Sequence, residues 1–279
     1  MFDRLAVRRH RDRAAATLPV VADILDELSQ RLLDRLDDTT HRFTEALDIG
    51  GRGAIAPVLR ARGMRVVSID PSPRLAACAG GLAVAGDAEF MPLAPGKFDV
   101  AIACLSLHWI NDLPGALIQI RQSLRPDGLF LASVPVLGTL DALRRALTAT
   151  EAELTGGASP RVSPFPDLRD CASLLQRAGF ALPVADVEDI ELVYADPFAL
   201  LRDLRAAGET NAVRLRSRRP PPPALFPTAL AAMRGDGEKL RINLRLATLT
   251  GWAPSATQPQ PLKPGTGQVS LTKFLNSDG

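Results

Sequence analysis

Five short segments between residues 46 and 135 constrain the fold of this chain more than any other feature. Each segment joins a strand-like apolar run to an acidic or glycine residue at its C-terminal end. In an open α/β sheet, ligands bind outside the carboxyl ends of the strands, so the series predicts a cofactor cleft as well as a fold. In chain order the segments are 46–53 (ALDIGGRG), 66–72 (VVSIDPS), 86–93 (GDAEFMPL), 98–110 (FDVAIACLSLHWI) and 124–133 (LRPDGLFLAS).

Strand and helix patterns alternate through this region and beyond it. The run 98–104 is almost continuously apolar, as expected for a strand that helices cover on both faces. The alternation predicts βαβ units, an α/β fold class and a mostly parallel sheet. Strands are predicted at 45–49, 65–69, 82–85, 98–104, 129–134, within 181–193 and at 241–251, and helices at 54–62, from Pro73, and at 112–124, 137–154, 168–178 and 197–207.

The N-terminus and two later stretches fall outside this rhythm. Residues 4–36 carry apolar side chains at helical spacing, so residues 1–40 are predicted to form a helical cap. Residues 41–279 are then the α/β domain, with helical insertions at about 136–178 and 196–239 of the kind that covers an active site. Loops are predicted at 156–160, at 220–223, where four prolines form a stiff spacer, and at 259–267.

Composition and charge exclude several classes of protein. The 279 residues carry a net charge of +2, so no global field favours nucleic acid or a membrane surface. No run approaches the ~18 apolar residues of a membrane span, and the N-terminus lacks the apolar region of a secretory signal. Cys78, Cys104 and Cys171 form no CxxC pair. A zinc site and a disulfide framework are therefore not expected, and a cytoplasmic location fits best.

A glycine-rich turn follows the first predicted strand. Such turns bring backbone N–H groups close to a ligand, and here the glycines are Gly50, Gly51 and Gly53. Their order lacks the GxGxxG pattern of dinucleotide-binding folds. The acid before the turn, Asp48, would repel a phosphate and suits a cationic group, such as the amino group of a methionine moiety. A plain strand-to-helix turn is the alternative interpretation.

Two further acids follow the second and third predicted strands. Asp70 lies 20 residues after Gly50, about the spacing at which an acidic side chain meets ribose hydroxyls. It could also cap the helix that begins at Pro73. Asp87, with Ala88 after it, can accept a hydrogen bond from an adenine amine, although taken alone it would be a turn residue. Because Asp87 is in register with Asp48 and Asp70, a ligand-binding role is favoured for it.

The ordered segments resemble the class I S-adenosylmethionine-dependent methyltransferases. The resemblance covers most of residues 44–135 and is specific as an ordered set. It implies a Rossmann-like fold with a seven-stranded, mostly parallel sheet and an antiparallel last strand, which 241–251 would supply. It also implies S-adenosylmethionine as the cofactor. The binding residues that it implies are Asp48, Gly50, Gly51 and Gly53 on the methionine side, Asp70 at the ribose, and Asp87 and Ala88 at the adenine.

Six other segments carry a narrower resemblance over nearly the whole length. They are 2–4 (FDR), 9–15 (RHRDRAA), 106–114 (SLHWINDLP), 160–165 (PRVSPF), 208–211 (GETN) and 250–252 (TGW). They are similar to the mitochondrial complex I assembly factor five group and its bacterial relatives, and more distantly to the biotin-pathway malonyl-carrier methyltransferases. The family implies action on an arginine of a quinone-module subunit of complex I, described as hydroxylation. Its loop usually reads Asp-x-Gly-x-Gly-x-Gly, whereas residues 48–53 are one residue shorter, so the role of each glycine stays open.

Few residues offer acid–base chemistry beside the predicted cleft. Methyl transfer needs little of it, since positioning the acceptor supplies most of the effect. His108 and Trp109 directly follow the strand 98–104. His108 could orient or deprotonate an acceptor, and Trp109 could wall the cofactor or stack on a guanidinium, although an ordinary buried pair is the alternative. Candidates for the acceptor pocket are Tyr194, Glu209 and Asn211.

A resident metal is not expected. A non-haem iron site needs two histidines and a carboxylate around one metal, and His10, His41 and His108 lie in separate elements. The densest charge cluster is residues 8–13 in the cap. Its arginines Arg8, Arg9, Arg11 and Arg13 could close over the cleft and face an acidic partner, or they could form a solvated helix face.

The sequence therefore predicts an S-adenosylmethionine-dependent methyltransferase-type enzyme that acts on a protein, with a role in complex I assembly implied by the resemblance. The expected partner is a quinone-module subunit, reached by peripheral association with a membrane complex. Three alternatives remain open. They are arginine hydroxylation on the same fold, a non-catalytic assembly factor, and methylation of a small molecule or a carrier protein.

Overall fold

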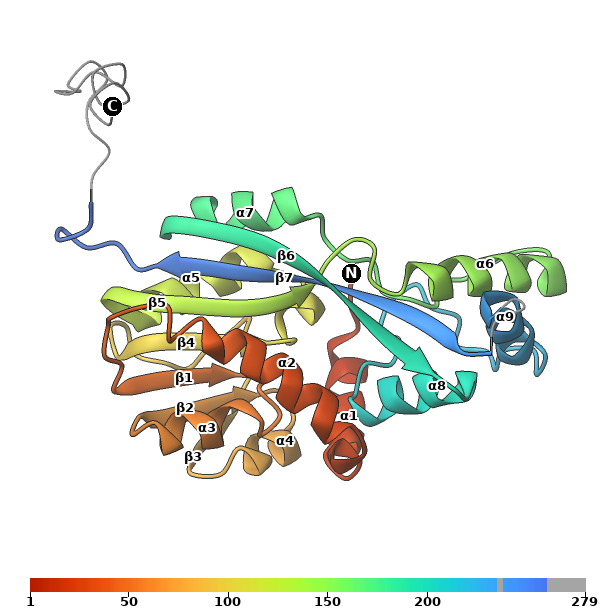
Figure 1. Ribbon diagram of the computed structural model, residues 1–279, viewed down its shortest axis with the longest axis horizontal. Helices are drawn as coiled ribbons and strands as arrows, with labels where there is room; N and C mark the ends of the chain where they lie inside the picture. The colour runs from red at the N-terminus through yellow and green to blue at the C-terminus, as the bar shows by residue number, and fades with distance from the viewer. Residues whose placement is uncertain (235–237, 260–279) are drawn as a thin grey trace, which may run out of the picture.

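The computed structural model describes residues 1–234 and 238–259, so residues 260–267 of the predicted final loop lie outside the described residues. Its strands are β1 Glu45–Ile49, β2 Arg65–Asp70, β3 Leu82–Ala85, β4 Phe98–Cys104, β5 Leu124–Pro135, β6 Ala181–Tyr194 and β7 Leu240–Trp252. They form one seven-stranded sheet with the order β3-β2-β1-β4-β5-β7-β6 (Figure 1). Strand β7 is antiparallel to β5 and β6, and the other pairings are parallel. The predicted fold class and antiparallel last strand are confirmed.

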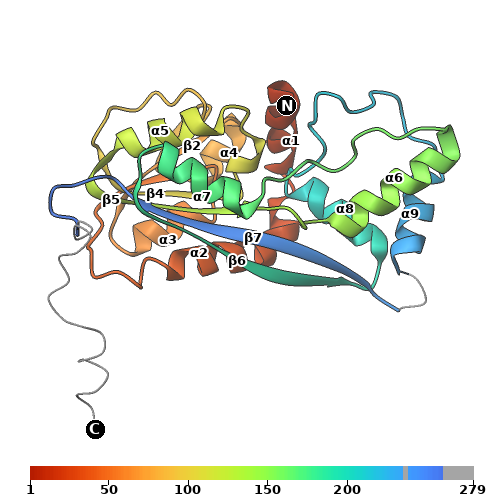
Figure 2. The same ribbon diagram turned by 90° about the horizontal axis from the view of Figure 1, so that it is seen from above.

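Helices cover both faces of the sheet (Figure 2). The α-helices of the described chain are α1 Arg4–Ala14, α2 Ala22–Asp34, α3 Ile55–Ala61, α4 Pro73–Cys78, α5 Leu113–Ser123, α6 Asp141–Thr155, α7 Leu168–Arg177, α8 Pro197–Ala206 and α9 Leu225–Arg234. Helices α2 and α3 share a buried cluster with Val100 and Ile102 of β4, whereas α5 and α7 share one with Ala101 and Ala103. Because side chains alternate across a strand, a strand buried on both faces needs an unbroken apolar run.

The stretch 4–36, predicted to be helical, is interrupted and forms two helices. Helix α1 ends at Ala14 and α2 begins at Ala22, with a short 3-10 turn at Leu18–Val21 between them. That turn contains Pro19, which has no N–H to donate and whose ring would clash inside a continuous helix. The break allows α2 to pack on the sheet while α1 lies beside the carboxyl ends of the strands (Figure 1).

Two further differences from the prediction concern the insertions. Helix α6 begins at Asp141 rather than at 137, because Gly138 and Leu140 have φ angles of +106° and +54°, outside the helical region. Helix α9, which was not predicted, follows the tetraproline directly and packs against α6. No helix in the described residues is both long and apolar enough to cross a membrane.

Strands β6 and β7 extend past the other strands and carry a second cluster of helices (Figure 1). Helices α6, α8 and α9 bury Leu143, Leu200 and Leu225 together against Leu240 and Ile242 of β7. Helix α7 belongs to the main core, where its Leu175 is fully buried. The division of the chain into a cap, a domain and insertions stays a prediction.

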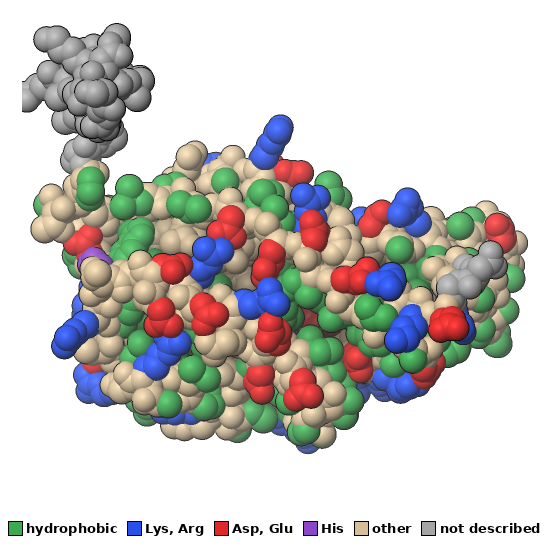
Figure 3. Space-filling view, viewed as in Figure 1, with side chains coloured by type: hydrophobic (Ala, Val, Ile, Leu, Met, Phe, Trp, Pro, Cys, Tyr) green, Lys and Arg blue, Asp and Glu red, His purple; other side chains and the backbone are tan. Residues whose placement is uncertain are grey.

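The outer edge of the sheet is charged. Arg31 of α2 forms an ion pair with Glu188 of the edge strand β6, and Arg35, directly after α2, forms one with Asp186 of the same strand. Figure 3 shows acidic and basic side chains mixed over this face. Charged side chains on an edge strand oppose its pairing with another chain.

Candidate functional site

The acids singled out in the sequence meet at one edge of the sheet. Asp48 lies in β1, Asp70 ends β2, and Asp87 follows β3. Since these strands are parallel neighbours, their carboxyl ends lie side by side. A small cleft of about 50 Å³ at this edge is lined by Gly50, Asp87, Ala88 and Trp109 among others. The other predicted cofactor residues do not line it.

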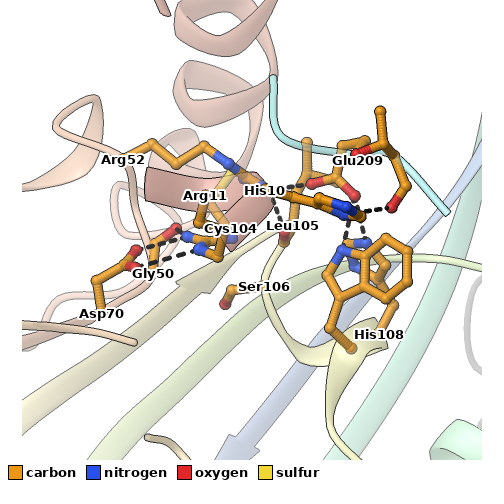
Figure 4. A network of polar contacts seen from close by, with 12 residues as sticks. His10, Arg11, Gly50, Arg52, Asp70, Cys104, Leu105, Ser106, His108 and Glu209 are labelled. Atoms are coloured by element: carbon orange, nitrogen blue, oxygen red, sulfur yellow. Dashed lines mark hydrogen bonds and ion pairs between the residues drawn. The ribbon is translucent and has the colours of Figure 1, made fainter. Parts of the chain in front are cut away.

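Asp70 does not line the cleft because Arg11 of helix α1 covers its carboxylate. Arg11 Nε and Nη2 donate to the two carboxylate oxygens of Asp70 at 3.1 and 2.6 Å, and Nη2 also donates to the Gly50 carbonyl at 3.0 Å (Figure 4). Both side chains are almost fully buried. Burial opposes the charge of Arg11, but the Asp70 carboxylate outweighs it and raises the pKa of Arg11. The expected acidic partner of the cap is therefore an acid of this chain.

Asp70 does not cap the following helix. The N-cap of α4 is Ser72, whose hydroxyl accepts from the Leu75 N–H, while Asp70 Oδ1 accepts from the Ser72 N–H at 2.8 Å. The capping interpretation of Asp70 is thus wrong. The Asp70 carboxylate is instead oriented toward the cleft edge, where Arg11 covers it.

Asp87 is covered by the same helix. It forms an ion pair with Arg4, whose guanidinium also lies 5.1 Å from the ring centroid of Phe90. It also makes the turn contact considered from the sequence, because Oδ1 accepts from the Glu89 N–H at 2.9 Å. Helix α1 therefore places one arginine on each of two acids, and what remains of the cleft is about 50 Å³.

The glycine turn is packed tightly against its own neighbours. Asp48 is 1% exposed; its Oδ2 accepts from the Ser68 hydroxyl, and its Oδ1 has no hydrogen-bond partner among the described residues. Burial raises the pKa of Asp48 to about 7. A Cβ on Gly51 would lie 2.1 Å from Asp48 Oδ1, and Gly50 has a φ of +66°. The chain's own packing thus requires these glycines, whatever the turn binds.

Asp48→Asn is expected to stabilise the protein at alkaline pH and not at acidic pH. The folded pKa of about 7 lies above the unfolded value, so the protonated form favours folding, and this contribution is lost as the pH rises through 7. A shift of this size corresponds to about 4 kcal/mol at most. Denaturant unfolding of both proteins at pH 5 and pH 8 measures the effect. A stability difference that is equal at the two pH values would contradict the shift.

A second cluster joins three distant parts of the chain. Glu209, which follows α8, accepts from His108 Nε2 and Trp109 Nε1 at 2.8 Å each and forms an ion pair with Arg52. Figure 4 shows the Glu209 carboxylate between Arg52 and His108. Burial alone would raise the pKa of Glu209, but His108 and Arg52 lower it to about 2. The carboxylate is therefore ionised and fixes the orientation of both ring systems.

Glu209 also determines which nitrogen of His108 is free. Because Nε2 donates to the carboxylate, the neutral imidazole has its lone pair on Nδ1. That atom is buried and has no hydrogen-bond partner within the described chain. Such an atom can accept a proton or a hydrogen bond from a ligand. The pairing of Arg52 with Glu209 was not predicted, since nothing in the glycine turn signals it.

A chamber of about 780 Å³ opens beside this cluster. Trp109 lines both the chamber and the small cleft, so the two spaces adjoin. The candidates Tyr194, Glu209 and Asn211 all line the chamber, and so does His108. Segments 9–15, 160–165 and 208–211, which carried the narrower resemblance, each contribute to its wall. No group of three or more side chains suited to a metal occurs in the described ranges.

Comparisons with known proteins identify the family and the fold. The sequence profile of a family described as "Methyltransferase domain" matches residues 7–183. The chain is 33% identical to "Arginine-hydroxylase NDUFAF5, mitochondrial" of Danio rerio over 97% of this chain and 88% of that protein. It is 35% identical to the "Malonyl-[acyl-carrier protein] O-methyltransferase" of Xylella fastidiosa over 92% and 90%. The YcgJ protein of Bacillus subtilis has a similar fold, with a TM-score of 0.56 and 13% identity over 81% of this chain and 98% of that one.

Proposed function

The chain belongs to the methyltransferase-domain family, and from that premise we propose that it is an S-adenosylmethionine-dependent enzyme that acts on a protein during complex I assembly. The observation that carries the proposal is the meeting of Asp70, Asp87 and Gly50 at one sheet edge, directly beside a large chamber. The resemblance of the non-core segments supports the protein substrate and the assembly role, and the printed name of the Danio rerio relative supports an arginine as the acceptor. A cytoplasmic location is proposed with it, supported by three free cysteines.

The residues at the sheet edge fit the cofactor. Asp70 accepts two N–H groups of Arg11 on its two oxygens, so it can equally accept the two hydroxyls of a ribose. In this proposal Asp87, beside Ala88, accepts from the adenine amine, and Gly50 contacts the methionine moiety; all three residues line the small cleft. Bound there, S-adenosylmethionine supplies an electrophilic methyl group on a sulfonium centre.

Helix α1 must move before the cofactor binds. A cleft of about 50 Å³ holds little more than a water or two, whereas small-molecule sites need roughly 300–1,000 Å³. Arg11 and Arg4 cover the two acids that the cofactor requires. The described structure is thus a closed form, and opening of α1 releases both acids together.

His108 and Glu209 supply the acid–base chemistry that the acceptor needs. Glu209 holds His108 through Nε2, which leaves Nδ1 to take a proton from the reacting group. Trp109, held by the same carboxylate, forms the wall between cleft and chamber. In this proposal His108 acts on the acceptor, and Glu209 is its positioning residue.

Arginine hydroxylation is the second candidate, favoured by the printed name of the Danio rerio relative. It needs an oxidant in addition to the groups seen here. Mass spectrometry of the candidate complex I subunit, purified with and without this protein in the cell, separates the two reactions. If the subunit from cells that lack this protein is lighter by the mass of a methylene group, the reaction is methylation. If it is lighter by the mass of an oxygen atom, the reaction is hydroxylation. An unchanged subunit would contradict both.

The cofactor is tested separately by titration calorimetry. S-Adenosylmethionine is expected to bind the full chain, and Asp70→Asn is expected to weaken binding at least tenfold, because the ribose loses its carboxylate. Glu153→Gln, an exposed change on α6, is the control and should bind like the parent protein. No heat of binding at millimolar cofactor would contradict the enzyme proposal and favour a non-catalytic assembly factor.

A further inference from the structure

The large chamber is mostly apolar. Its volume of about 780 Å³ lies within the range of small-molecule sites. Its walls come from α2, α6, α8 and the extended ends of β6 and β7. The apolar residues that line it include Ile24, Leu28, Leu143, Leu147, Leu201 and Leu244. Burial of a long aliphatic group there would be favourable, because it removes apolar surface from water.

The charges on the chamber wall are mainly positive. Five arginines line it, against Asp203 and Glu209. Three of the five have carboxylate partners: Arg52 pairs with Glu209, Arg161 with Glu151, and Arg202 with Asp196. For the other two, Arg13 and Arg205, the described structure records no ion pair. Arg13 donates a hydrogen bond to the neutral Thr210 hydroxyl at 3.0 Å, but neither arginine has a counter-charge among the described residues. Cations without a counter-charge beside an apolar space favour an anionic ligand.

Arg13 and Arg205 lie close to each other at the exposed rim. Arg13 is in the last turn of α1 and Arg205 in the last turn of α8, and the two helices are in contact. Burial and the charge of Arg205 lower the pKa of Arg13. His10 is beside them, and its pKa is lowered by burial and by Arg13. Burial is the larger cause of both shifts, and the second cause in each is the charge of a neighbouring arginine, which an anion would offset.

Buried polar atoms without partners give a second, independent indication of a ligand. Arg52 Nε, His108 Nδ1 and Ser163 Oγ are each buried and unpaired within the described residues. Their side chains all line the chamber and belong to residues that are 5–8% exposed. A buried polar atom without a partner is unfavourable, so these atoms favour a filled chamber over an empty one.

We propose that the chamber binds a long-chain amphiphile with an anionic head, its aliphatic body among the leucines and its head at Arg13 and Arg205. The inference goes beyond the proposed function, because it concerns what fills the chamber and not which group receives the chemistry.

Calorimetric titration of the full chain with dodecanoate, below its micelle concentration, tests the proposal. Dodecanoate is expected to bind at least tenfold more tightly than butanoate, which lacks the chain, and than dodecyltrimethylammonium, which has the opposite charge. Dodecyl phosphate, titrated in parallel, shows whether a carboxylate or a phosphate head is preferred, and tight binding of either supports the proposal. Equal binding of the cation, or no binding of either anion, would overturn it.

Two sets of variants locate the ligand. The double variant Arg13→Glu, Arg205→Glu changes two exposed side chains. It is expected to bind dodecanoate at least tenfold more weakly than the parent protein and dodecyltrimethylammonium more tightly. Arg9→Glu, exposed on α1 and outside the chamber, is the matched control. Ile24→Trp fills the chamber from a half-buried position and should also weaken dodecanoate. Circular dichroism verifies folding. If the rim pair and Arg9→Glu have equal effects, the head does not bind at the rim. S-Adenosylmethionine titration reports the proposed function independently.

Discussion

Arg11→Ala is expected to bind S-adenosylmethionine at least tenfold more tightly than the parent protein. In the closed form Arg11 holds both oxygens of Asp70 and the Gly50 carbonyl, so the cofactor competes with a guanidinium for the same acceptors. When only a fraction of molecules is open, the measured affinity falls by that fraction. A tenfold gain corresponds to about 1.4 kcal/mol and requires only a modest preference for closure in the parent.

In the absence of cofactor, Arg11→Ala is expected to lower the stability of the protein. Removing one partner of a buried ion pair leaves the other charge uncompensated, which typically costs about 3–5 kcal/mol. Arg11 and Asp70 are 3% and 4% exposed, so the ligand-free variant is expected to be less stable and its α1 to exchange amide hydrogen faster. Added cofactor should restore much of that stability, because the ribose satisfies Asp70.

Two controls make the result specific. Arg9→Ala changes an exposed arginine of the same helix and should leave cofactor affinity unchanged. Arg11→Ala combined with Asp70→Asn should lose the gain, since the acid that Arg11 covers is then absent. A weaker affinity in Arg11→Ala alone would show that this arginine holds the cofactor rather than excluding it.

The central sheet could be predicted because its signals are local. Strand β4 is covered on both faces, so its sequence is apolar apart from Asp99, and its predicted bounds of 98–104 match the structure. Helix α3 is followed by Gly63 at a φ of +86°, a conformation that glycine adopts without strain. The apolar run of β4 and the glycine after α3 each depend only on residues that are neighbours in sequence, so both can be predicted from the sequence.

The closed site could not be predicted, because its contacts are between distant residues. Arg11 and Asp70 are 59 positions apart, and Arg52 and Glu209 are 157 apart. Which arginine reaches which acid depends on the direction that α1 takes after the break near Pro19, and helical spacing does not give that direction. Of the four cap arginines considered from the sequence, Arg11 covers an acid at the cleft, whereas Arg8, Arg9 and Arg13 are exposed, as the alternative of a solvated helix face predicts. The partner acid came only from the structure.

Glu209→Gln is expected to lower the free energy of unfolding at neutral pH by about 3 kcal/mol. The pKa of Glu209 is lowered from its ordinary value to about 2, so its stabilising contribution is complete above the unfolded value and is lost as the pH falls through 2. The carboxylate is 19% exposed, and Arg52 beside it is 2% exposed. The glutamine leaves that buried guanidinium without a counter-charge.

The pH dependence distinguishes this cause from a general packing defect. The stability difference between Glu209→Gln and the parent should be largest above pH 5 and should shrink toward pH 2, where the parent carboxylate is itself protonated. Glu153→Gln, an exposed change, is the control and should show no such trend. If the difference is independent of pH, the charge of Glu209 is not its source.

A catalytic readout tests the positioning role directly. The Glu209→Gln variant lacks the charge that orients His108 as a base, so its turnover is expected to fall more than tenfold with cofactor affinity nearly unchanged. His108→Ala should lose turnover to a similar extent, and combining the two changes should add little, because both act through one proton acceptor. Fully additive losses would show that Glu209 acts through Arg52 and the closed cap instead of through His108.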